Sequence, residues 1–450
     1  MTRFPDDFLW GVATSAFQIE GSLDADGRGP SIWDSFRGES GDTGAVACDH
    51  YRRWRSDLDL LAELSLNAYR FSIAWPRVHP DGRRLERRGL DHYDRLVDRL
   101  VELGVEPIVT LYHWDLPQAL QDEGGWLSRD TAERFAEHAV VCFDALGDRV
   151  RIWLTICEPW IVGLLGYLLV LHAPGVRDDL RGEATAFHHL LLAHGRTVRA
   201  FRESGREGRI GLDPNLMPHY PANGDEPADA EMARASDGYV NRWFLDALFR
   251  GSYPEDQRAR YEERIGPLDF VRDGDLATIA EPTDYVGVNY YAPRWMQAVP
   301  GDTPWPWRVV VPQGTDTTGG FTAGVPQTEA GTPIVPRGLT DLLVRVRDDY
   351  GDVPILITEN GAVFNEPLHD ERRVNFIRDH LLAVREAIGR GVNVLGYCHW
   401  SFMDNFEWKL GYAQRFGLVH VDYDTLERTV KDSGRYYARI AALNEVVEPE

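Results

Sequence analysis

The sequence predicts a single (β/α)8 TIM barrel with extended βα loops, formed as one domain over residues 1–450. Eight short runs rich in Val, Ile, Tyr and Phe alternate with longer segments of helical period, which is the pattern that builds parallel sheets. The composition does not change at any midpoint that could separate two domains. A length of 450 residues also lies within the range of one barrel with insertions.

The predicted strands are near-continuously apolar, as strands covered on both faces of a sheet should be. We expect them at residues 8–13, 67–74, 106–112, 152–157, 209–213, 285–289, 354–359 and 394–400. Helices are expected between them, because apolar residues recur at helical spacing from Tyr93 to Val101 and from Val374 to Ile388. A glycine follows as the stop signal of each helix, at Gly104 and Gly389.

Two stretches, residues 214–229 and 292–337, break this rhythm. Loops of that length inside a compact domain are usually functional walls or lids. In a barrel of this kind, chemistry takes place at the C-terminal ends of the strands. The polar residues found there are therefore the candidates for a functional site.

The charge and the cysteine content argue against several classes of protein. A net charge of −23 repels polyphosphate and anionic membrane surfaces, so neither nucleic acid nor a membrane is expected as a partner. Cys48, Cys142, Cys157 and Cys398 show no CxxC spacing, which disfavours a disulfide framework or a zinc site and favours a reducing cytoplasm. The amino terminus lacks the basic start and apolar stretch of an export signal. The most apolar run, residues 160–171, is far shorter than the ~20 residues that span a bilayer.

Two glutamates end two apolar strands of the predicted barrel. Glu158 follows residues 152–157, and Pro159 then ends that strand and helps to fix how the carboxylate is presented. Glu359 closes residues 354–359 in the same way. A lone glutamate at a strand end is commonly an ion pair or a helix cap, but two at one barrel mouth indicate a carboxylate pair. Cleavage of a glycosidic bond needs such a pair, because one group protonates the departing oxygen while the other attacks or activates water.

Aromatic and polar side chains gather at the same strand ends. Sugar rings present flat C–H faces and hydroxyl edges, so a sugar site pairs aromatic platforms with Gln, His, Asn and Glu. The aromatic candidates, each of which could instead be barrel core, are Tyr112, Trp114, Tyr290, Tyr291, Trp400 and Trp408, and the polar ones are Gln18, His113, Asn289 and Glu407. Motifs of metalloproteases, EF-hands, phosphate loops, dinucleotide sites and serine hydrolases are absent, so no metal or cofactor is expected.

At these positions the sequence resembles glycoside hydrolase family 1, the β-glucosidase family, over nearly its whole length. The matching stretches are FLWGVATSAFQIEG (8–21), YRFSIAWPR (69–77), LYHWDLP (111–117), GVNYY (287–291), ITENG (357–361) and DNFEW (404–408). The resemblance implies a retaining β-glycosidase that hydrolyses small β-glycosides through a covalent glycosyl-enzyme intermediate. It implies that Glu359 is the nucleophile and Glu158 the acid/base, with Arg70 and Tyr291 keeping the nucleophile ionised and oriented.

The resemblance also implies which side chains hold the sugar. These are Gln18, His113, Trp114, Trp400, Glu407 and Trp408, beside the candidate Asn289 and the 2-hydroxyl position Cys157. Retention requires the two carboxyl groups to lie about 5 to 5.5 Å apart. The acid/base Glu158 needs a raised pKa to hold its proton near neutrality.

One residue departs from the family pattern inside the expected site. Family members read Asn-Glu-Pro at the acid/base, and the asparagine binds the sugar 2-hydroxyl, whereas this chain has Cys157. A thiol is a weak donor and too short to replace an amide, so transition-state help from the 2-hydroxyl should be reduced. Two interpretations stay open: a natural or engineered substitution in a weakened β-glucosidase, or a glycone that is deoxygenated or altered at carbon 2.

Other departures lie on the leaving-group side. Residues 168–171, Leu-Leu-Val-Leu, replace a glycine-bearing run, and Thr332 stands where a tryptophan is common. We expect an apolar aglycone site widened near Thr332, although the leucines could instead only pack beneath the loop. His399 also differs from the family pattern, but a lone histidine beside Trp400 is more commonly a core residue, so we assign it no role.

The sequence therefore predicts a cytoplasmic, metal-independent β-glycosidase whose partner is a small-molecule β-glycoside. Transglycosylation is a nearby alternative, because an apolar acceptor site competes with water for the same intermediate. A sugar-binding protein that has lost turnover through Cys157 is the alternative from a different class. The glycone epimer (gluco, galacto or fuco), the natural aglycone, the salt requirement and any homo-oligomer are left open.

Overall fold

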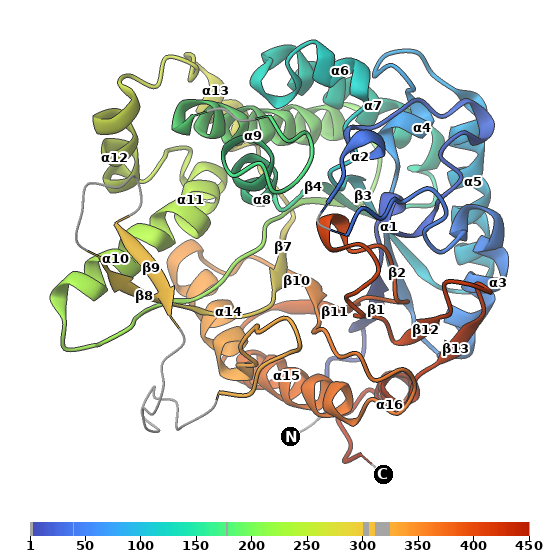
Figure 1. The fold of residues 1–450 in the computed structure, drawn as a ribbon. Helices are drawn as coiled ribbons and strands as arrows, with labels where there is room; N and C mark the ends of the chain where they lie inside the picture. Colours follow the sequence, from blue (N-terminus) through green and yellow to red (C-terminus); the bar gives the residue numbers. More distant parts are fainter. Residues whose placement is uncertain (1–2, 39, 177–178, 300–305, 311–324, 450) are drawn as a thin grey trace.

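The computed structural model describes residues 3–38, 40–176, 179–299, 306–310 and 325–449. A central barrel of strands is surrounded by helices, and the two termini lie near one another at its lower edge (Figure 1). The backbone N–H of Phe4 donates to the carbonyl of Asn444 at 3.0 Å, which joins the two ends of the chain. No helix in these ranges combines the length and the apolar character that a bilayer crossing requires.

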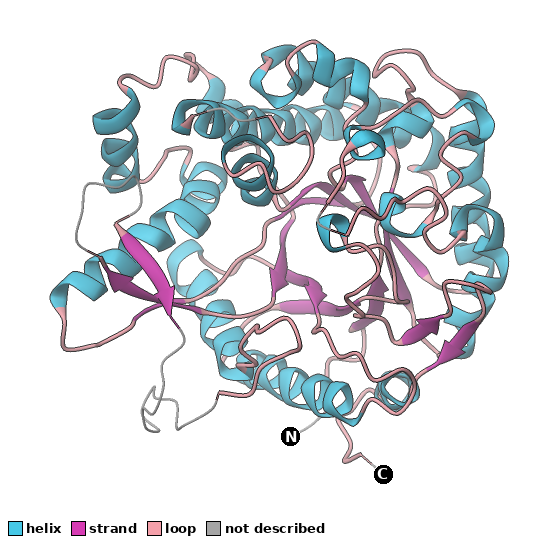
Figure 2. Ribbon diagram, in the orientation of Figure 1, coloured by secondary structure: helices cyan, strands magenta, loops and turns pink. Residues whose placement is uncertain are grey.

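Eight parallel strands close the barrel in the order β1-β11-β10-β7-β5-β4-β3-β2, as the magenta arrows of Figure 2 show. They are β1 (Leu9–Ala13), β2 (Ala68–Ser72), β3 (Glu106–Tyr112), β4 (Ile152–Cys157), β5 (Arg209–Asp213), β7 (Tyr285–Tyr290), β10 (Ile355–Asn360) and β11 (Val394–Trp400). Each lies on a predicted apolar run, within two residues at either end. The predicted barrel is confirmed.

The helices cover the outside of the barrel. They are α1 (Ala16–Ile19), α2 (Ile32–Ser35), α3 (His50–Glu63), α4 (Trp75–Val78), α5 (Arg87–Glu102), α6 (Gln118–Asp122), α7 (Arg129–Leu146), α8 (Pro159–Gly163), α9 (Leu180–Glu203), α10 (Pro227–Asp237), α11 (Trp243–Arg250), α12 (Glu255–Ile265), α13 (Asp275–Ile279), α14 (Pro336–Tyr350), α15 (Glu371–Gly389) and α16 (Asp432–Leu443). Helix α5 buries the predicted stripe that contains Tyr93, Leu96 and Leu100. It ends before Gly104, whose φ of 71° is accessible to glycine at little cost.

The two irregular stretches contain more structure than the sequence predicts. In the first, β6 (His219–Pro221) pairs with β8 (Arg294–Ala298), and α10 begins at Pro227. In the second, β8 pairs with β9 (Trp307–Val310) to complete a small sheet outside the barrel, while residues 300–305 and 311–324 lie outside the described residues. These strands are three to five residues long and pair with distant partners, so no local period identifies them. A further hairpin, β12 (Val419–Val421) with β13 (Arg428–Val430), follows the last barrel strand.

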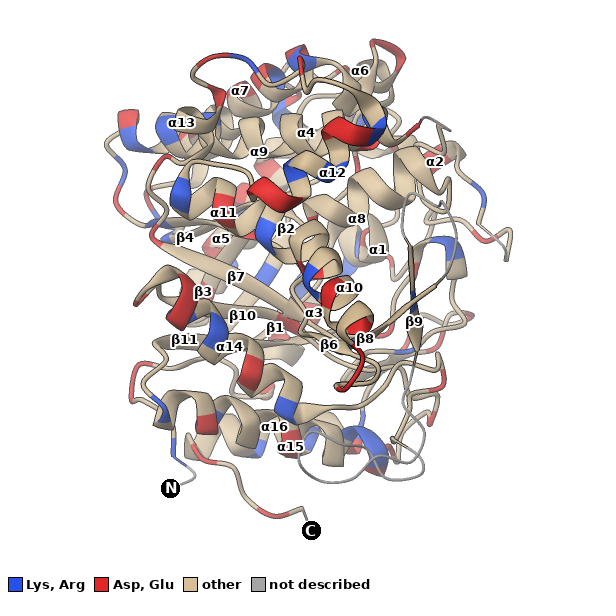
Figure 3. Cartoon of the chain, turned by 90° about the vertical axis from the view of Figure 1, so that its left-hand side faces the viewer, with Lys and Arg blue, Asp and Glu red and all other residues tan. Residues whose placement is uncertain are grey.

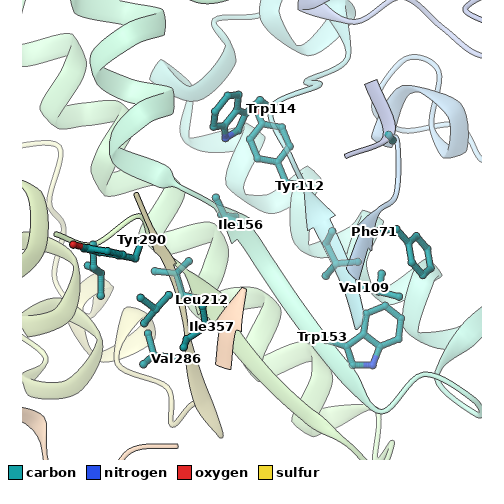
Figure 4. Close-up of a cluster of buried hydrophobic side chains, with 14 of the residues drawn as sticks. Phe71, Val109, Tyr112, Trp114, Trp153, Ile156, Leu212, Val286, Tyr290 and Ile357 are labelled. Atoms are coloured by element: carbon teal, nitrogen blue, oxygen red, sulfur yellow. The ribbon is translucent and has the colours of Figure 1, made fainter. Parts of the chain in front are cut away.

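The barrel strands bury both of their faces. Side chains from neighbouring strands, such as Leu212, Val286 and Ile357, pack together beneath the surrounding helices (Figure 4). A separate cluster fills the barrel interior and contains Ala13, Ala68, Ile108, Leu154, Tyr285, Leu356, Cys398 and Trp400. Because side chains alternate along a strand, the residue two positions beyond an interior Ala68 again points inward, and that residue is Arg70. The polar site therefore lies directly above the apolar side chains that fill the barrel interior.

Charges of both signs are interspersed over the helices and loops (Figure 3). The net charge of −23 thus arises from an excess of acids spread over the surface, many of them paired with arginine. All four cysteines are free and buried, as expected for a chain without a disulfide framework.

Candidate active site

The two predicted glutamates line one cavity of ≈ 250 Å³ at the C-terminal mouth of the barrel, here called the glutamate cavity. Glu158 follows β4 and Glu359 is the fifth residue of β10. Glu158 has φ 49° and ψ 62°, an uncommon conformation for a residue with a side chain. Pro159 disfavours the right-handed helical conformation for the residue that precedes it, which restricts the backbone of Glu158.

Glu359 is held by two donors. Arg70 Nη1 donates to Oε1 at 2.5 Å, and the Tyr291 hydroxyl donates to Oε2 at 2.6 Å. Both donors are fixed by the fold, because Arg70 lies within β2 and Tyr291 directly follows β7. A carboxylate held in this way has both oxygens engaged and its charge stabilised.

Glu158 is in a different environment. Burial, and then the neighbouring charge of Glu359, raise the pKa of Glu158 well above its usual range. Its Oε1 accepts hydrogen bonds from Asn289 Nδ2 at 2.8 Å and from Asn215 Nδ2 at 3.2 Å, which oppose the shift in pKa. A raised pKa is the direction that a general acid working near neutrality requires.

Cys157 lies behind the glutamate cavity and is fully buried. Its Sγ accepts a hydrogen bond from Arg70 Nη2 at 3.3 Å and a longer contact from Asn289 Nδ2 at 3.6 Å. Burial raises the pKa of this thiol well above its usual range, so it stays protonated. Cys157 is absent from the residues that line the cavity, so its thiol offers a sugar hydroxyl little direct contact.

Asp213, Asn215 and Thr358 are parts of this network that sequence reasoning missed. Asp213 pairs with Arg70 on the side opposite Glu359, and Thr358 donates to Asn289 Oδ1 at 2.8 Å. Asp213 ends β5, and Asn215 lies two residues further on. The rule that sites form at strand ends could have identified both, but neither belongs to a motif that carried the family resemblance.

The opposite wall of the glutamate cavity holds the predicted sugar contacts. Gln18 Nε2 donates to Glu407 Oε2 at 3.2 Å and to Asn405 Oδ1 at 3.0 Å. Burial, and then Glu359, raise the pKa of Glu407 to about 8. His113, Trp114, Trp400, Glu407 and Trp408 all line the cavity, and the ring of His113 stacks on that of Trp400 with centroids 5.7 Å apart.

Two aromatic candidates and one histidine lie elsewhere. The Tyr112 hydroxyl accepts a hydrogen bond from Trp126 Nε1 at 3.0 Å, and the Tyr290 hydroxyl donates to the carbonyl of Val335 at 2.7 Å. Both rings belong to the hydrophobic core around the barrel, and Figure 4 shows the ring of Tyr112 next to that of Trp114. Tyr112 and Tyr290 each precede a residue that faces the barrel interior. Because side chains alternate between the two faces of a strand, both rings face outward. His399 is fully buried, in agreement with its assignment to the core.

Thr332 also lines the glutamate cavity. A second depression of ≈ 970 Å³, here called the leucine hollow, is lined by Leu164, Leu168, Leu169, Tyr239, Arg294 and Trp307 among others. Leu169 and Leu171 are 46% and 39% exposed, so these two leucines do not simply pack beneath the loop.

Among the described residues, His113, Cys157 and Glu359 bring three metal-ligand atoms within 4.8 Å of one another. Arg70 donates to both Cys157 and Glu359, so a cation at this point would lie against a guanidinium charge. The protonated thiol is also a poor ligand. The arrangement does not fit a resident metal ion.

Two carboxyl groups line one cavity: both oxygens of Glu359 accept hydrogen bonds, and the pKa of Glu158 is raised. Such a pair is equipped for acid/base and nucleophilic chemistry on an acetal. The walls of aromatic, amide and carboxylate groups suit a sugar.

Several relatives match almost the entire chain. Beta-glucosidase A of Acetivibrio thermocellus is 43% identical over 98% of both chains, and a bifunctional beta-D-glucosidase/beta-D-fucosidase of Bifidobacterium breve is also 43% identical over 98% of both. Among solved structures, a family 1 β-glucosidase from Thermotoga maritima superposes with a TM-score of 0.92 at 41% identity, covering 99% of each chain. The sequence model described as glycosyl hydrolase family 1 matches residues 1–446. The chain therefore belongs to glycosyl hydrolase family 1 and is a glycoside hydrolase.

Proposed function

We propose that this chain is a retaining β-glycosidase in which Glu359 is the nucleophile and Glu158 the acid/base. The observation that carries the proposal is the opposite environment of two carboxyl groups in one cavity. Glu359 receives hydrogen bonds from Arg70 and Tyr291, whereas burial raises the pKa of Glu158. A nucleophile needs the first environment and a general acid the second.

The reaction proceeds in two steps. In the first, Glu359 forms a bond to carbon 1 while the bond from carbon 1 to the leaving oxygen breaks, and Glu158 transfers its proton to that oxygen. In the second, Glu158 removes a proton from water, the resulting oxygen bonds to carbon 1, and Glu359 leaves as a carboxylate. Two inversions give overall retention. Arg70 and Tyr291 stabilise the carboxylate before the first step and after the second.

The glycone is held by the wall that contains His113 and Glu407, and Gln18 donates to Glu407 from behind that wall. Relatives named for β-glucosidase and β-D-fucosidase activity support gluco- or fuco-configured β-glycosides as the first substrates to test. A panel of nitrophenyl β-glycosides that includes the galacto epimer would identify the glycone.

At carbon 2, the contacts of Cys157 with Arg70 and Asn289 support a subsite that offers no amide donor. Both interpretations of this residue remain: an ordinary β-glucosidase of reduced activity, or an enzyme for glycones altered at carbon 2. On the leaving-group side, the exposed leucines support an apolar aglycone site. The same site would accept an alcohol in competition with water, which makes transglycosylation a second activity to measure.

Azide rescue tests the two catalytic roles separately. Glu359→Gly with an activated dinitrophenyl β-glycoside and azide should give the α-glycosyl azide, because azide replaces the nucleophile in one inversion. Glu158→Gly should give the β-glycosyl azide, because azide attacks the covalent intermediate. In the unmodified enzyme, proton NMR should detect the β-anomer as the first sugar product. An α-anomer first would overturn retention, and the absence of turnover on the whole panel would favour the sugar-binding alternative.

A further inference from the structure

Two arginines line the leucine hollow, the exposed Arg264 of α12 and the more enclosed Arg294. Arg294 comes from β8 and is half-buried, whereas Leu164 and Leu168 come from the helical turn that follows α8. The remaining lining is mostly apolar and includes Tyr239 and Trp307, with Asp179 and Glu263 as its acidic residues.

Arg294 has no carboxylate partner in the described part of the chain. Its guanidinium Cζ lies 5.1 Å from the centroid of the Trp160 ring, and Tyr239 is the nearest group that favours its charge. Burial lowers the pKa of Arg294, as expected for a cation that has lost water without gaining an anion. The acidic residues at the rim, Asp179 and Glu263, form no ion pair with it.

The other arginines enclosed by this fold are paired. Arg77 contacts Glu20 at 2.9 Å, Arg242 contacts Asp237 at 2.9 Å, and Arg373 contacts Asp370 at 2.8 Å. Even Arg345, which is 32% exposed, pairs with Asp237. A partly desolvated guanidinium without an anion is energetically unfavourable, and a bound anion would relieve that cost. In a chain of net charge −23, acidic partners are abundant, so the isolation of Arg294 is not due to a shortage of them.

The position of Arg294 connects it with the reaction. Trp160, on which it stacks, lies two residues after Glu158, and Arg294 itself lies three residues after Tyr291. Glu158 protonates the leaving oxygen in the proposed function, so a leaving group directed along the side of Trp160 would approach Arg294 and the leucine hollow. An apolar body would contact the leucines there, and a group at its far end would reach Arg294.

We propose that the leucine hollow binds the aglycone of an anionic β-glycoside, with the apolar body of the aglycone on Leu164 and Leu168 and a terminal carboxylate on Arg294. This inference rests on the proposed function, since it names the substrate class of the same site. A planar guanidinium matches a carboxylate with two parallel hydrogen bonds, which a neutral amide of equal size cannot reproduce.

Two matched substrates test the proposal. Both are built on the glycone that the nitrophenyl panel selects, and their aglycones are 3-(4-hydroxyphenyl)propanoate and the corresponding propanamide. The saturated spacer keeps the pKa of the two phenol leaving groups nearly equal. A difference in kcat/KM therefore reports how the enzyme binds the terminal carboxylate or amide. The unmodified enzyme should favour the carboxylate by about ten- to a hundredfold, the value of a charge-assisted hydrogen bond.

Two variants test whether Arg294 causes the preference for the carboxylate substrate. Arg294→Met keeps an apolar chain against Trp160 and should reduce the carboxylate-to-amide ratio to about one. Arg258→Met removes an exposed arginine of α12, which is 59% exposed, and should leave the ratio unchanged because it alters only net charge. If Arg294→Met does not fold, competitive inhibition of the unmodified enzyme by the free acid and by the free amide gives the same comparison.

The outcomes separate this inference from the proposed function. Turnover of the amide substrate with a carboxylate-to-amide ratio near one in the unmodified enzyme would overturn the inference and leave the proposed function intact. Equal ratios in Arg294→Met and the unmodified enzyme would also overturn it. Failure to turn over any glycoside of the panel would instead overturn the proposed function.

Discussion

The thiol of Cys157 accepts a hydrogen bond from Arg70 at 3.3 Å, while the same guanidinium donates to Glu359 at 2.5 Å. Arg70 therefore joins the unusual residue at position 157 to the proposed nucleophile. The thiol also lies 3.7 Å from Glu359 Oε1. A substitution at this position is expected to change both the contact with the sugar and the support of Arg70.

The first prediction concerns Cys157→Asn. The amide should regain a hydrogen bond to the 2-hydroxyl that strengthens in the transition state, so kcat/KM on an aryl β-glucoside should rise about ten- to a hundredfold. The 2-deoxy substrate lacks that hydroxyl and should gain little. Parallel kinetics on both substrates measure the difference. A strong existing preference for the 2-hydroxylated sugar, unchanged in the variant, would show that the carbon 2 hypothesis is wrong.

The second prediction concerns Tyr291→Phe. Loss of the 2.6 Å hydrogen bond to Glu359 should lower kcat about ten- to a hundredfold, because a donor positioned on a reacting carboxylate is removed. Tyr290→Phe is the matched control, since Tyr290 donates to the carbonyl of Val335 outside the cavity. The control should lower the free energy of unfolding by about 1 kcal/mol and leave kcat nearly unchanged. Equal losses of kcat in both variants would contradict the role of Tyr291.

The third prediction concerns pH. Glu158 must be protonated to act as an acid, and burial together with Glu359 raises its pKa. Activity should therefore be retained through the range in which an ordinary glutamate has already ionised, and should fall as the pH rises through the raised pKa. Glu158→Gln, assayed with a dinitrophenyl substrate that needs no acid, should lose this alkaline decline. If Glu158→Gln showed the same decline in activity at alkaline pH, the decline would belong to another titrating group.

The fourth prediction concerns stability. Asp404 contacts Lys431 Nζ at 2.8 Å and Arg415 Nη1 at 2.7 Å. Burial acts against ionisation, but Lys431 and Arg415 hold the pKa of Asp404 well below its usual range. The stability that this group contributes is thus present above the pKa of an unfolded aspartate and is lost as the pH falls toward the native value.

Asp404→Asn should lower the free energy of unfolding by about 3 to 5 kcal/mol near neutrality, because Lys431 is left buried without its carboxylate. Thermal melts from pH 7 to pH 3 would measure this loss. The difference in stability between the unmodified protein and Asp404→Asn should become smaller toward pH 3. The second variant, Asp404→Asn with Lys431→Met, should recover part of the loss. No recovery would indicate that the hydrogen bond to Gly417, at 3.0 Å, is the main contribution.

The fifth prediction concerns the leucine hollow. Leu168→Ser should lower kcat/KM on an octyl β-glucoside about threefold to tenfold, as expected when part of a leucine contact is lost. Cellobiose, whose leaving group is polar, should be affected less. Leu443→Ser is the control, because Leu443 is 50% exposed at the end of α16, far along the chain from the hollow. Equal effects on octyl glucoside and cellobiose would contradict an apolar aglycone site.

The barrel and its two glutamates follow from local features of the chain. Buried parallel strands need long apolar runs, and a polar residue at the end of such a run, as at Glu158 and Glu359, is visible without any knowledge of its neighbours. The direction of a side chain across a strand is harder to predict, because one residue of register decides it. Tyr290 and Tyr291 are adjacent and chemically alike, yet one packs against the carbonyl of Val335 and the other donates to Glu359.

Relationships between distant segments could not be read from the linear chain. Asp213 completes the ion pairs of Arg70 across 143 residues, and Arg294 faces a hollow formed by leucines from a different loop. Periodicity and spacing describe neighbours within one element, whereas ion pairing and burial depend on which elements meet when the barrel closes. The amino acids thus specify the strands and supply the reactive groups, but the folded chain selects which charges find partners. Among the described residues it provides no carboxylate partner for Arg294.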